Sequence, residues 1–142
     1  MSSAIEITSD PGRIDIDTLH AWLASSYWAP GIPKEVVKRS IDGSIPFTAF
    51  LDGRQVGFAR VVTDRATFAW LADVWVEESQ RGKRIGHALM EAVVAHPDLQ
   101  GLRRFLLATR DAHGLYAQYG FEPIDKPEAY MAVRKAPAEL YG

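Results

Sequence analysis

The sequence predicts a mixed α+β fold, in which a central, mostly antiparallel sheet is flanked by helices. Between residues 47 and 76, runs rich in β-branched and aromatic residues are separated only by short turns, which is typical of three antiparallel strands in a meander. Between residues 85 and 93, apolar residues recur every three or four positions, which indicates a helix with one buried face. Consecutive strands followed by an amphipathic helix are typical of the α+β class.

Length and composition indicate one folded domain over residues 1–142. A chain of 142 residues can bury roughly two thirds of the surface that it exposes when unfolded. Hydrophobic residues make up 47% of the chain and charged residues 24%, which excludes a disordered or fibrous protein.

Charge and residue types exclude several classes of function. The net charge of −2 gives no general attraction to nucleic acid or to an anionic membrane, so an anion site must come from a local basic cluster, such as 81–84. The absence of cysteine excludes disulfides, thiolate metal sites and a cysteine nucleophile, and we expect no metal centre. The N-terminus lacks a signal-peptide pattern and no stretch approaches the roughly 20 apolar residues of a membrane span. We expect a cytoplasmic protein.

The N-terminal third predicts one strand and two helices. Residues 5–7 alternate as a short strand does, and the turn at 9–12 ends it. Apolar residues at helical spacing then predict a helix from Asp15 to near Tyr27, with the aspartate as its N-cap. After a break at 28–31, Pro33 suits the first turn of a second short helix.

The remaining elements follow from the same rules. The expected strands are 47–51, 55–63, 67–76, 104–108 and 130–133, and the expected helices are 85–93 and 112–119. The turn 52–53 joins the first two strands, Pro97 stops the long helix and Gly120 ends the short one. We expect both Phe121 and the segment 130–133 to pair back onto the sheet.

Residues 81–86, which read Arg-Gly-Lys-Arg-Ile-Gly, predict a phosphate site. They lie between a strand and an amphipathic helix, where the free N–H groups of the first helical turn converge on an anion. Gly82 and Gly86 let a phosphate approach the backbone, and Arg81, Lys83 and Arg84 add cationic donors. The alternative interpretation is a basic segment that only solubilises the surface. Neither the P-loop spacing nor the Gly-x-Gly-x-x-Gly pattern of dinucleotide folds is present.

Two segments together resemble the GNAT superfamily of N-acetyltransferases. Residues 74–90 are similar to its acetyl-CoA motif, Arg/Gln-x-x-Gly-x-Gly/Ala, with Arg81 and Gly86 at the matching ends and Arg84 in place of the usual first glycine. Residues 109–121 are similar to the motif Asn-x-x-Ala-x-x-Leu-Tyr-x-x-x-Gly-Phe, with Thr109 in place of the asparagine. The resemblance spans about residues 4–134, which we take as the core of an N-acetyltransferase domain.

The resemblance implies an acyl-CoA N-acyltransferase fold and its chemistry. In this family the fourth strand bulges and splays from the fifth, so that the pantetheine arm of acetyl-CoA binds like an added strand. A substrate amine attacks the thioester directly, without an acyl-enzyme. The implied cofactor-binding residues are Val74, Val76, Arg81, Gly82, Lys83, Arg84, Ile85, Gly86, His87, Thr109 and Tyr116.

Three residues are implied as catalytic. The backbone N–H of Val74 would stabilise the oxyanion, and Tyr116 would give a proton to the departing thiolate, although a tyrosine before Gly-Phe can also be a packing residue. Asp73 is a candidate base or water-positioning carboxylate, with a salt bridge, a cap or simple attraction of a cationic substrate as alternatives. The acceptor wall would include Tyr27, Trp28 and Arg60, where Trp28 can equally belong to the core.

The leading hypothesis is therefore acetyl transfer from acetyl-CoA to a primary amine of a small molecule, an amino acid or a peptide. A catalytically silent CoA-binding sensor or partner-binding module is the alternative. Nucleic-acid binding through the basic residues is disfavoured by the net charge, and the sequence leaves a homodimer open.

Overall fold

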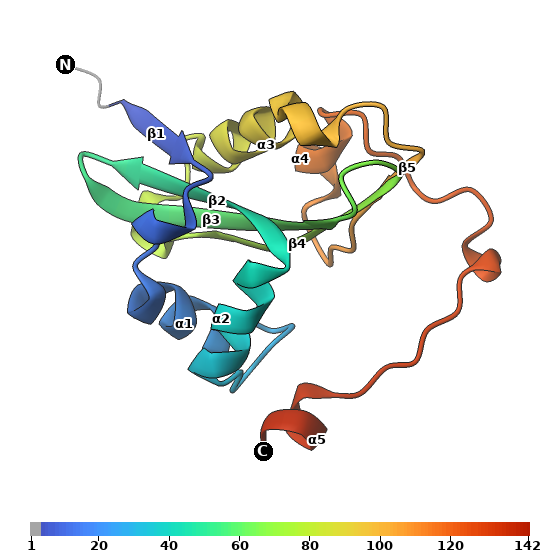
Figure 1. Cartoon of the computed structure of the whole chain (residues 1–142), viewed down its shortest axis with the longest axis horizontal. Coiled ribbons are helices and arrows are strands. Elements are labelled where there is room, and N and C mark those ends of the chain that lie inside the picture. The colour runs from blue at the N-terminus through green and yellow to red at the C-terminus, as the bar shows by residue number, and fades with distance from the viewer. Residues whose placement is uncertain (1–3) are drawn as a thin grey trace.

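The chain forms a five-stranded sheet with helices on both faces, as the computed structural model, which describes residues 4–142, shows (Figure 1). The strands are β1 (Ile5–Thr8), β2 (Ser44–Leu51), β3 (Arg54–Thr63), β4 (Phe68–Val76) and β5 (Arg104–Leu106). The helices are α1 (Ile16–Ala24), α2 (Lys34–Asp42), α3 (Ile85–Ala95), α4 (His113–Ala117) and α5 (Pro137–Tyr141).

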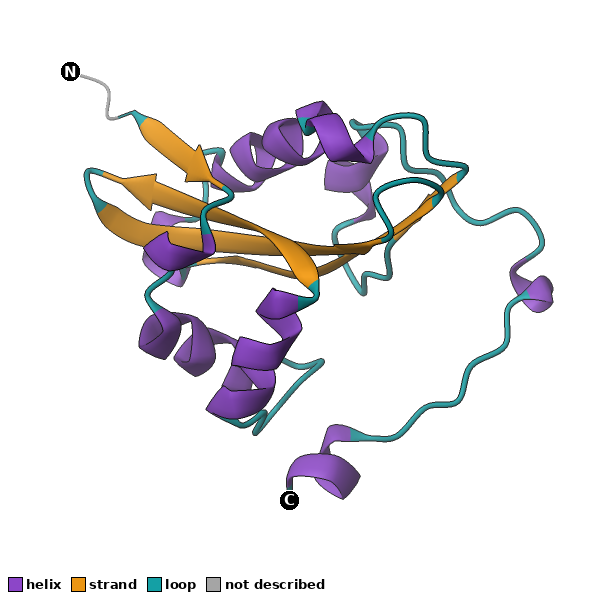
Figure 2. Cartoon of the chain, viewed as in Figure 1, coloured by secondary structure: helices purple, strands orange, loops and turns teal. Residues whose placement is uncertain are grey.

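The strands lie side by side in the order in which they occur in the sequence. Pairs from β1 to β4 are antiparallel, and β5 is parallel to β4. Helices α3 and α4 cover one face of the sheet, and α1 and α2 cover the other (Figures 1 and 2). The predicted mixed α+β class, with a mostly antiparallel sheet, is confirmed.

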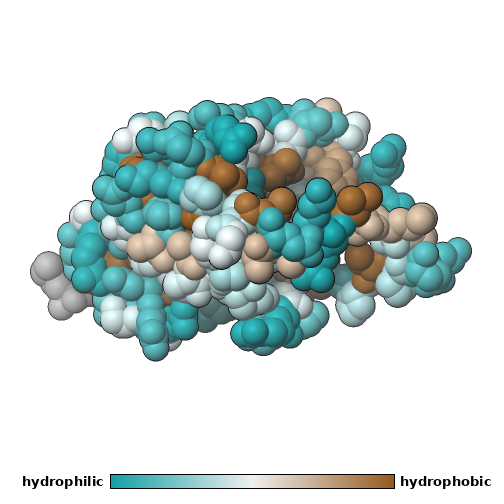
Figure 3. All heavy atoms as spheres, turned by 90° about the horizontal axis from the view of Figure 1, so that it is seen from below, coloured by the Kyte–Doolittle hydropathy of each residue, from teal (hydrophilic) through white to brown (hydrophobic). Residues whose placement is uncertain are grey.

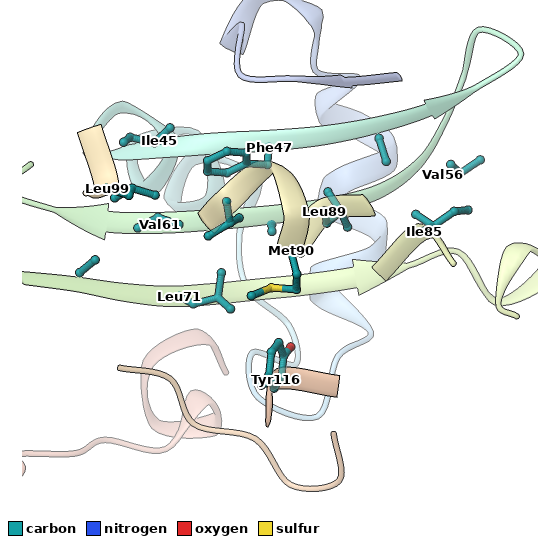
Figure 4. Packing of buried hydrophobic residues seen from close by; sticks show 14 residues of the cluster. Ile45, Phe47, Val56, Val61, Leu71, Ile85, Leu89, Met90, Leu99 and Tyr116 are labelled. Carbon is teal, nitrogen blue, oxygen red and sulfur yellow. The ribbon is translucent and has the colours of Figure 1, made fainter. Parts of the chain in front are cut away.

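The larger core lies between the sheet and α3. Its buried side chains come from β2, β3, β4 and one face of α3, and Tyr116 of α4 closes it at one side (Figure 4). Gly57 lies at the closest approach of the helix, because a Cβ at this position would be 2.9 Å from Cγ2 of Ile85 and 3.3 Å from Cδ1 of Leu89. The missing side chain lets the first turn of α3 sit directly on β3.

The smaller core lies on the opposite face, under α1 and α2. Leu19, Trp22 and Leu23 of α1 pack with Val37 of α2 and with Phe58 of β3. The start of α1 is fixed twice, because the Asp15 carboxylate accepts the N–H of Thr18, while the Gln55 side chain bonds both the N–H and the C=O of Asp15. The loop after α1 reaches β4, where Trp28 Nε1 donates a hydrogen bond to the Asp73 carboxylate.

A β-bulge interrupts β4 beyond the point where this strand pairs in parallel with β5. Phe58 pairs with Trp75 and Arg60 with Ala72, so two residues of β4, Asp73 and Val74, oppose one residue of β3. The bulge shifts the alternation of side chains by one position. Leu71 before the bulge and Val74 after it therefore both contact the larger core, and Asp73 contacts the opposite side, where Trp28 and Arg60 lie.

The prediction of a terminal strand at 130–133 is wrong. Lys126 has a φ of 58°, and the short 3-10 turn Pro127–Ala129 follows it, so the chain turns away from the edge of the sheet. Phe121 does not pair with the sheet either. Its ring packs edge-on against Phe105 of β5, with 5.2 Å between the ring centroids.

Several predicted ends also differ from the structure. α1 ends at Ala24, so Tyr27 lies in the loop that follows; β5 ends at Leu106; and α4 covers only residues 113–117. The helix α5 is an element that the sequence analysis did not predict.

Candidate functional site

The candidate site is a cavity of about 360 Å³ at the place where β4 and β5 separate. The two strands pair only over Phe68–Trp70 and Arg104–Leu106; beyond this point β4 continues without β5 to Val76. The cavity is lined by residues that the sequence analysis had selected from four distant segments: Tyr27, Trp28, Arg60, Asp73, Val74, Thr109 and Tyr116.

Asp73 is held in place by its backbone conformation and by two side chains. It has a φ of 56°, a left-handed conformation that is uncommon outside glycine, and the bulge holds it there. Trp28 Nε1 donates a hydrogen bond to one carboxylate oxygen at 2.9 Å, and Arg60 Nε donates to the other, also at 2.9 Å. Both side chains of the Arg60–Asp73 ion pair are mostly buried, with 17% and 11% exposed. The carboxylate is therefore fixed in position and direction.

Arg60 is itself anchored on its far side. Its Nη1 donates to Oγ of Ser44 at 3.0 Å, and this hydroxyl donates to the carbonyl of Ser40 at 2.6 Å. The connection from α2 to β2 thus supports the ion pair. The sequence analysis did not select Ser44, since a lone serine between a helix and a strand carries no signal of such a role.

The bulge leaves the backbone of β4 without strand partners at the cavity. Within the described residues 4–142, neither Asp73 nor Val74 has a partner residue in β3 or β5. Unpaired N–H and C=O groups at a strand edge form hydrogen bonds with an extended ligand. This stretch can therefore bind a chain that lies along β4.

Tyr116 lies at the boundary of the core and the cavity. Only 7% of the residue is exposed, and its ring stacks edge-on against Phe121. Burial, followed by the negative potential of Tyr27 and Asp111, raises the pKa of Tyr116 to about 12. The phenol therefore stays protonated, as a hydrogen-bond donor beside the cavity.

A second hollow, of about 440 Å³, lies at the start of α3 and next to the end of β4. It is lined by Val76, Arg81, Gly82, Arg84, Ile85, Gly86, His87 and Leu115. The first backbone bond of the helix runs from Ala88 N–H to Arg84 C=O, so the N–H groups of residues 85–87 have no acceptor within the helix. These groups and the helix dipole favour an anion in the hollow.

Two residues of this loop adopt positive φ. Gly82 has a φ of 88° and Arg84 one of 64°; Arg84 is the N-cap residue of α3 and makes no side-chain capping bond. Glycine adopts this left-handed backbone without strain, so glycine would suit position 84 as it does position 82. Arg84 instead bears a conformational cost on the order of 1 kcal/mol and adds a cation to the hollow.

The remaining basic groups of the loop are tied to its surroundings. Arg81 Nε donates to the carbonyl of Val76 at 3.0 Å, and its guanidinium lies 5.6 Å from the centroid of the Trp75 ring. Lys83 Nζ donates to the Gln80 side chain at 2.9 Å. Arg81 thus fastens the loop to the end of β4, which brings the hollow and the cavity onto one strand.

His87 and Thr109 each hold a local contact. Nδ1 of His87 lies 3.1 Å from the Tyr119 hydroxyl, which joins α3 to the end of the α4 segment. The Thr109 hydroxyl accepts the N–H of Ala112 at 3.1 Å and so closes the turn before α4. Both residues border the predicted ligand path, at its two ends.

Tyr27 contacts the opposite wall of the cavity. Its hydroxyl accepts the N–H of Arg110 at 3.3 Å, and the Arg110 guanidinium lies 4.0 Å from the centroid of the Tyr27 ring. The sequence analysis missed Arg110, although this residue directly follows Thr109 in the second motif. In the described residues 4–142, no cluster of three metal-ligating side chains and no helix long and apolar enough to cross a membrane is present.

Comparisons with known proteins agree with this geometry. A model of the Acetyltransferase (GNAT) family matches residues 13–121. The crystal structure of a GNAT-family protein from Xanthomonas campestris pv. campestris is 50% identical, with a TM-score of 0.92; the match covers 94% of this chain and 95% of that chain.

More distant proteins share the fold or part of the sequence. A GNAT family acetyltransferase from Elizabethkingia anophelis, crystallised with acetyl-CoA bound, is 16% identical, with a TM-score of 0.63, over 87% of this chain and 78% of that chain. A protein of Gibberella zeae that is named as an acetyltransferase is 27% identical over 135 residues, 79% of this chain and 75% of that protein. Because the family model spans α1 to α4 with both motifs, the chain belongs to the acetyltransferase (GNAT) family.

Proposed function

We propose that this acetyltransferase transfers an acetyl group from acetyl-CoA to a primary amine of a small molecule, an amino acid or a peptide, by direct attack within a ternary complex. The continuity of β4 and α3 carries this proposal. The partner-free edge at Asp73 and Val74 leads along β4 to Val76, and Val76 lines the hollow at the start of α3. One extended ligand can thus place its diphosphate at α3 and its acyl end at the bulge.

The loop before α3 is the proposed pyrophosphate site. The free N–H groups of Ile85, Gly86 and His87 would bind the phosphate oxygens, and Gly82 leaves room for the approach. Lys83 and Arg84 add positive charge. Arg81 contributes through its hydrogen bond to the carbonyl of Val76, which holds the loop next to the end of β4.

The backbone N–H of Val74 is the proposed donor to the carbonyl oxygen of the acetyl group. The bulge removes this residue from the ladder to β3. A preorganised donor of this kind contributes about 3–4 kcal/mol when negative charge develops on the oxygen.

Asp73 is proposed to orient the amine or a water molecule that takes its proton. Both carboxylate oxygens already accept a hydrogen bond, from Trp28 and from Arg60. Each oxygen keeps a second lone pair, with which it can accept from an ammonium group or from water. This arrangement supports a positioning carboxylate more than a base that acts alone.

Tyr116 is proposed to stabilise the departing thiolate. A thiol has a pKa of about 8.5, whereas the pKa of Tyr116 is raised to about 12. Complete proton transfer from the phenol to the thiolate is therefore unfavourable, by about 5 kcal/mol. A hydrogen bond from the phenol is the contribution that this difference permits.

The acceptor is proposed to enter between Tyr27 and Trp28 on one side and Arg60 and Asp73 on the other. These residues surround the mouth and one wall of the cavity. The aromatic rings suit the apolar part of an amine, and the carboxylate suits its charge.

Thiol release from acetyl-CoA in the presence of a panel of amines tests the proposal. We expect turnover with at least one primary amine, and a Gly86→Asp variant that stays folded but is no longer stabilised against heat by acetyl-CoA. If the protein binds CoA but turns over no amine, and if Tyr116→Phe leaves its affinity for CoA unchanged, the protein is a CoA-binding module. The proposal then fails.

A further inference from the structure

Trp70 is an exposed aromatic residue in the wall of the cavity, on the same strand as Asp73. Ala69 and Leu71 bury their side chains in the larger core, so Trp70 between them faces the other side of the sheet, where the Asp73 carboxylate lies. Figure 3, in which the molecule is seen from the side of α1 and α2, shows that apolar side chains reach the surface there. The backbone of Trp70 pairs with β3 on one side and with β5 on the other. The sheet therefore holds an indole at the cavity.

Two more aromatic rings stand on the loop after α1, which is fixed by its own hydrogen bonds. Ser26 is only 3% exposed, and its hydroxyl donates to the carbonyl of Leu23 at 2.7 Å and accepts the N–H of Ala29 at 3.1 Å. Tyr27 and Trp28 lie within this closed turn and pack edge-on, with 5.0 Å between their ring centroids. The loop therefore holds both rings at the cavity, which they line together with Trp70.

The charged side chains that line the cavity are Arg60, Asp73 and Asp111. Among the described residues 4–142, Arg60 is the only cation in this lining, and its guanidinium already binds Asp73 and Ser44. Arg110 Nη2 lies 3.7 Å from the Asp111 carboxylate, in an exposed pair that water screens. A substrate with a carboxylate beside its amine would thus bring a third negative charge to the cavity, where the charge of Arg60 is already balanced. The lining favours an amine without such a carboxylate.

The size of the cavity limits the ligand that can bind in it. Its volume of about 360 Å³ is at the lower end of the range for small-molecule sites. Trp70 and Asp73 are three positions apart, which is at most about 10 Å along an extended strand. Ala72 lies between them and leaves space between the indole and the carboxylate. A small ligand with a charged end and a flat apolar end, joined by a short chain, spans this distance.

We propose that the acceptor is a small arylalkylamine: a primary amine with an aromatic ring a few carbon atoms from the nitrogen and no carboxylate beside it. This inference rests on the acetyl transfer proposed above. The ammonium binds Asp73, and the ring packs against Trp70 and against the edge of the Tyr27–Trp28 pair. In the reaction the nitrogen forms a bond to the acetyl carbon and the carbon–sulfur bond breaks. Of the two protons that the ammonium loses, one goes to the thiol of CoA and one to solvent.

Thiol release from acetyl-CoA with four matched amines tests the proposal. Phenethylamine is the reference; phenylalanine adds a carboxylate to it, phenylalaninamide replaces that carboxylate by a neutral group, and butylamine lacks the ring. We expect kcat/KM for phenethylamine to exceed the values for phenylalanine and butylamine by about 20-fold or more. Phenylalaninamide should recover most of the loss that the carboxylate causes.

Trp70→Ala tests the contact with the ring. It should lower kcat/KM for phenethylamine by about 3- to 10-fold and leave kcat/KM for butylamine and the Kd for acetyl-CoA nearly unchanged. Trp70→Phe keeps an aromatic ring and should restore most of the activity on phenethylamine. Phe68→Ala is the matched control, since Phe68 is as exposed on the same strand, 38% against 37%, but does not line the cavity.

The outcomes separate this inference from the proposed function. Faster turnover of phenylalanine or butylamine than of phenethylamine overturns the inference and leaves the acetyl transfer standing, as does turnover of other primary amines without turnover of phenethylamine. Thiol release with no primary amine at all overturns both. Equal losses on phenethylamine and butylamine in Trp70→Ala would show that Trp70 does not bind the ring, which also contradicts the inference.

Discussion

Tyr27 and Arg110 meet beside the cavity at which β4 and β5 separate, from two loops that are 83 residues apart in the sequence. The guanidinium lies over the ring, and the hydroxyl accepts the backbone N–H of the same arginine. The contact joins the loop after α1 to the loop after β5, and both loops contribute residues to the lining of the cavity.

Arg110→Ala should therefore change acceptor binding and leave the donor site intact. An exposed cation–π contact contributes about 0.5–1 kcal/mol, so we expect the KM for the amine to change by about 2- to 5-fold. Steady-state kinetics and the Kd for acetyl-CoA measure the two sites separately. Arg103→Ala, at an exposed position outside the cavity, is the control. An equal effect of both variants would exclude a role for the contact.

Gly57→Ala should destabilise the protein and weaken acetyl-CoA binding together. The new methyl group would lie 2.9 Å from Ile85 and 3.3 Å from the carbonyl of Trp75, so the first turn of α3 must move. Overpacking of this kind costs about 1–3 kcal/mol in the free energy of unfolding. Denaturant unfolding and calorimetric titration measure the two effects. Gly43→Ala, where no atom lies within 4 Å of the new Cβ, should change neither.

Arg84→Gly should have opposite effects on stability and on binding. Relief of the left-handed conformation should stabilise the free protein by up to about 1 kcal/mol, whereas loss of the cation should weaken acetyl-CoA binding. Arg65→Gly is a close control, because Arg65 also has a positive φ, 65°, but lies in the turn between β3 and β4. It should keep the affinity for acetyl-CoA unchanged. If Arg84→Gly binds acetyl-CoA as tightly as the wild type, Arg84 does not contact the pyrophosphate.

Tyr116→Phe should lower kcat by about 10-fold or more and leave the Kd for acetyl-CoA nearly unchanged. The same variant also tests the raised pKa. The phenol ionises near pH 10.0 in the unfolded chain and near pH 12 in the folded protein. Between these values the unfolded state binds fewer protons, so this contribution to stability is present below pH 10 and is lost as pH rises toward 12. It amounts to at most about 3 kcal/mol.

Ultraviolet titration of the phenolate and denaturant unfolding at several alkaline pH values measure this effect. In Tyr116→Phe the ionisation near pH 12 and its part of the stability loss should both be absent. An unchanged titration would assign the late ionisation to another group.

Asp73→Asn should lower kcat/KM for the amine by about 10-fold or more, because the carboxylate that orients the ammonium or the water is lost. The amide oxygen can still accept from Trp28, but the amide NH2 group then faces Arg60 Nε, so the loss of the buried ion pair is measured separately, as a change in the free energy of unfolding. Asp111→Asn removes a charge from the same cavity at a much more exposed position and is the matched comparison. Equal losses in both variants would mean that only the overall negative potential matters.

Much of the fold could be predicted because local patterns and tertiary packing agree. The helix at α3 and the three central strands bury the faces that their periodicity indicates. The failure at 130–133 has a physical reason: β-branched and aromatic residues give strand propensity, but a strand also needs a partner edge. The left-handed Lys126 turns the chain away from the nearest edge.

The candidate site was predictable only where residue type and motif coincide. Asp73, Val74, Tyr116 and the loop before α3 stand in recognisable segments, and the structure brings them to one strand and its neighbours. The contacts that fix them were not predictable, because Trp28 reaches Asp73 across 45 positions and Ser44 reaches Arg60 across 16. Such contacts depend on the complete packing of α1 and α2 against the sheet.

The bulge in β4 shifts the alternation of core-facing and outward-facing side chains by one residue. Without it, the alternation that buries Ala69 and Leu71 would turn residue 73 toward α3, and the carboxylate would lie in the apolar core. Deletion of Ala72 or Asp73 would instead restore regular alternation: Leu71 and Val74 would both keep the core face, but Val74 would rejoin the ladder to β3 and the site would be lost. The site therefore depends on the number of residues in β4 as well as on their side chains.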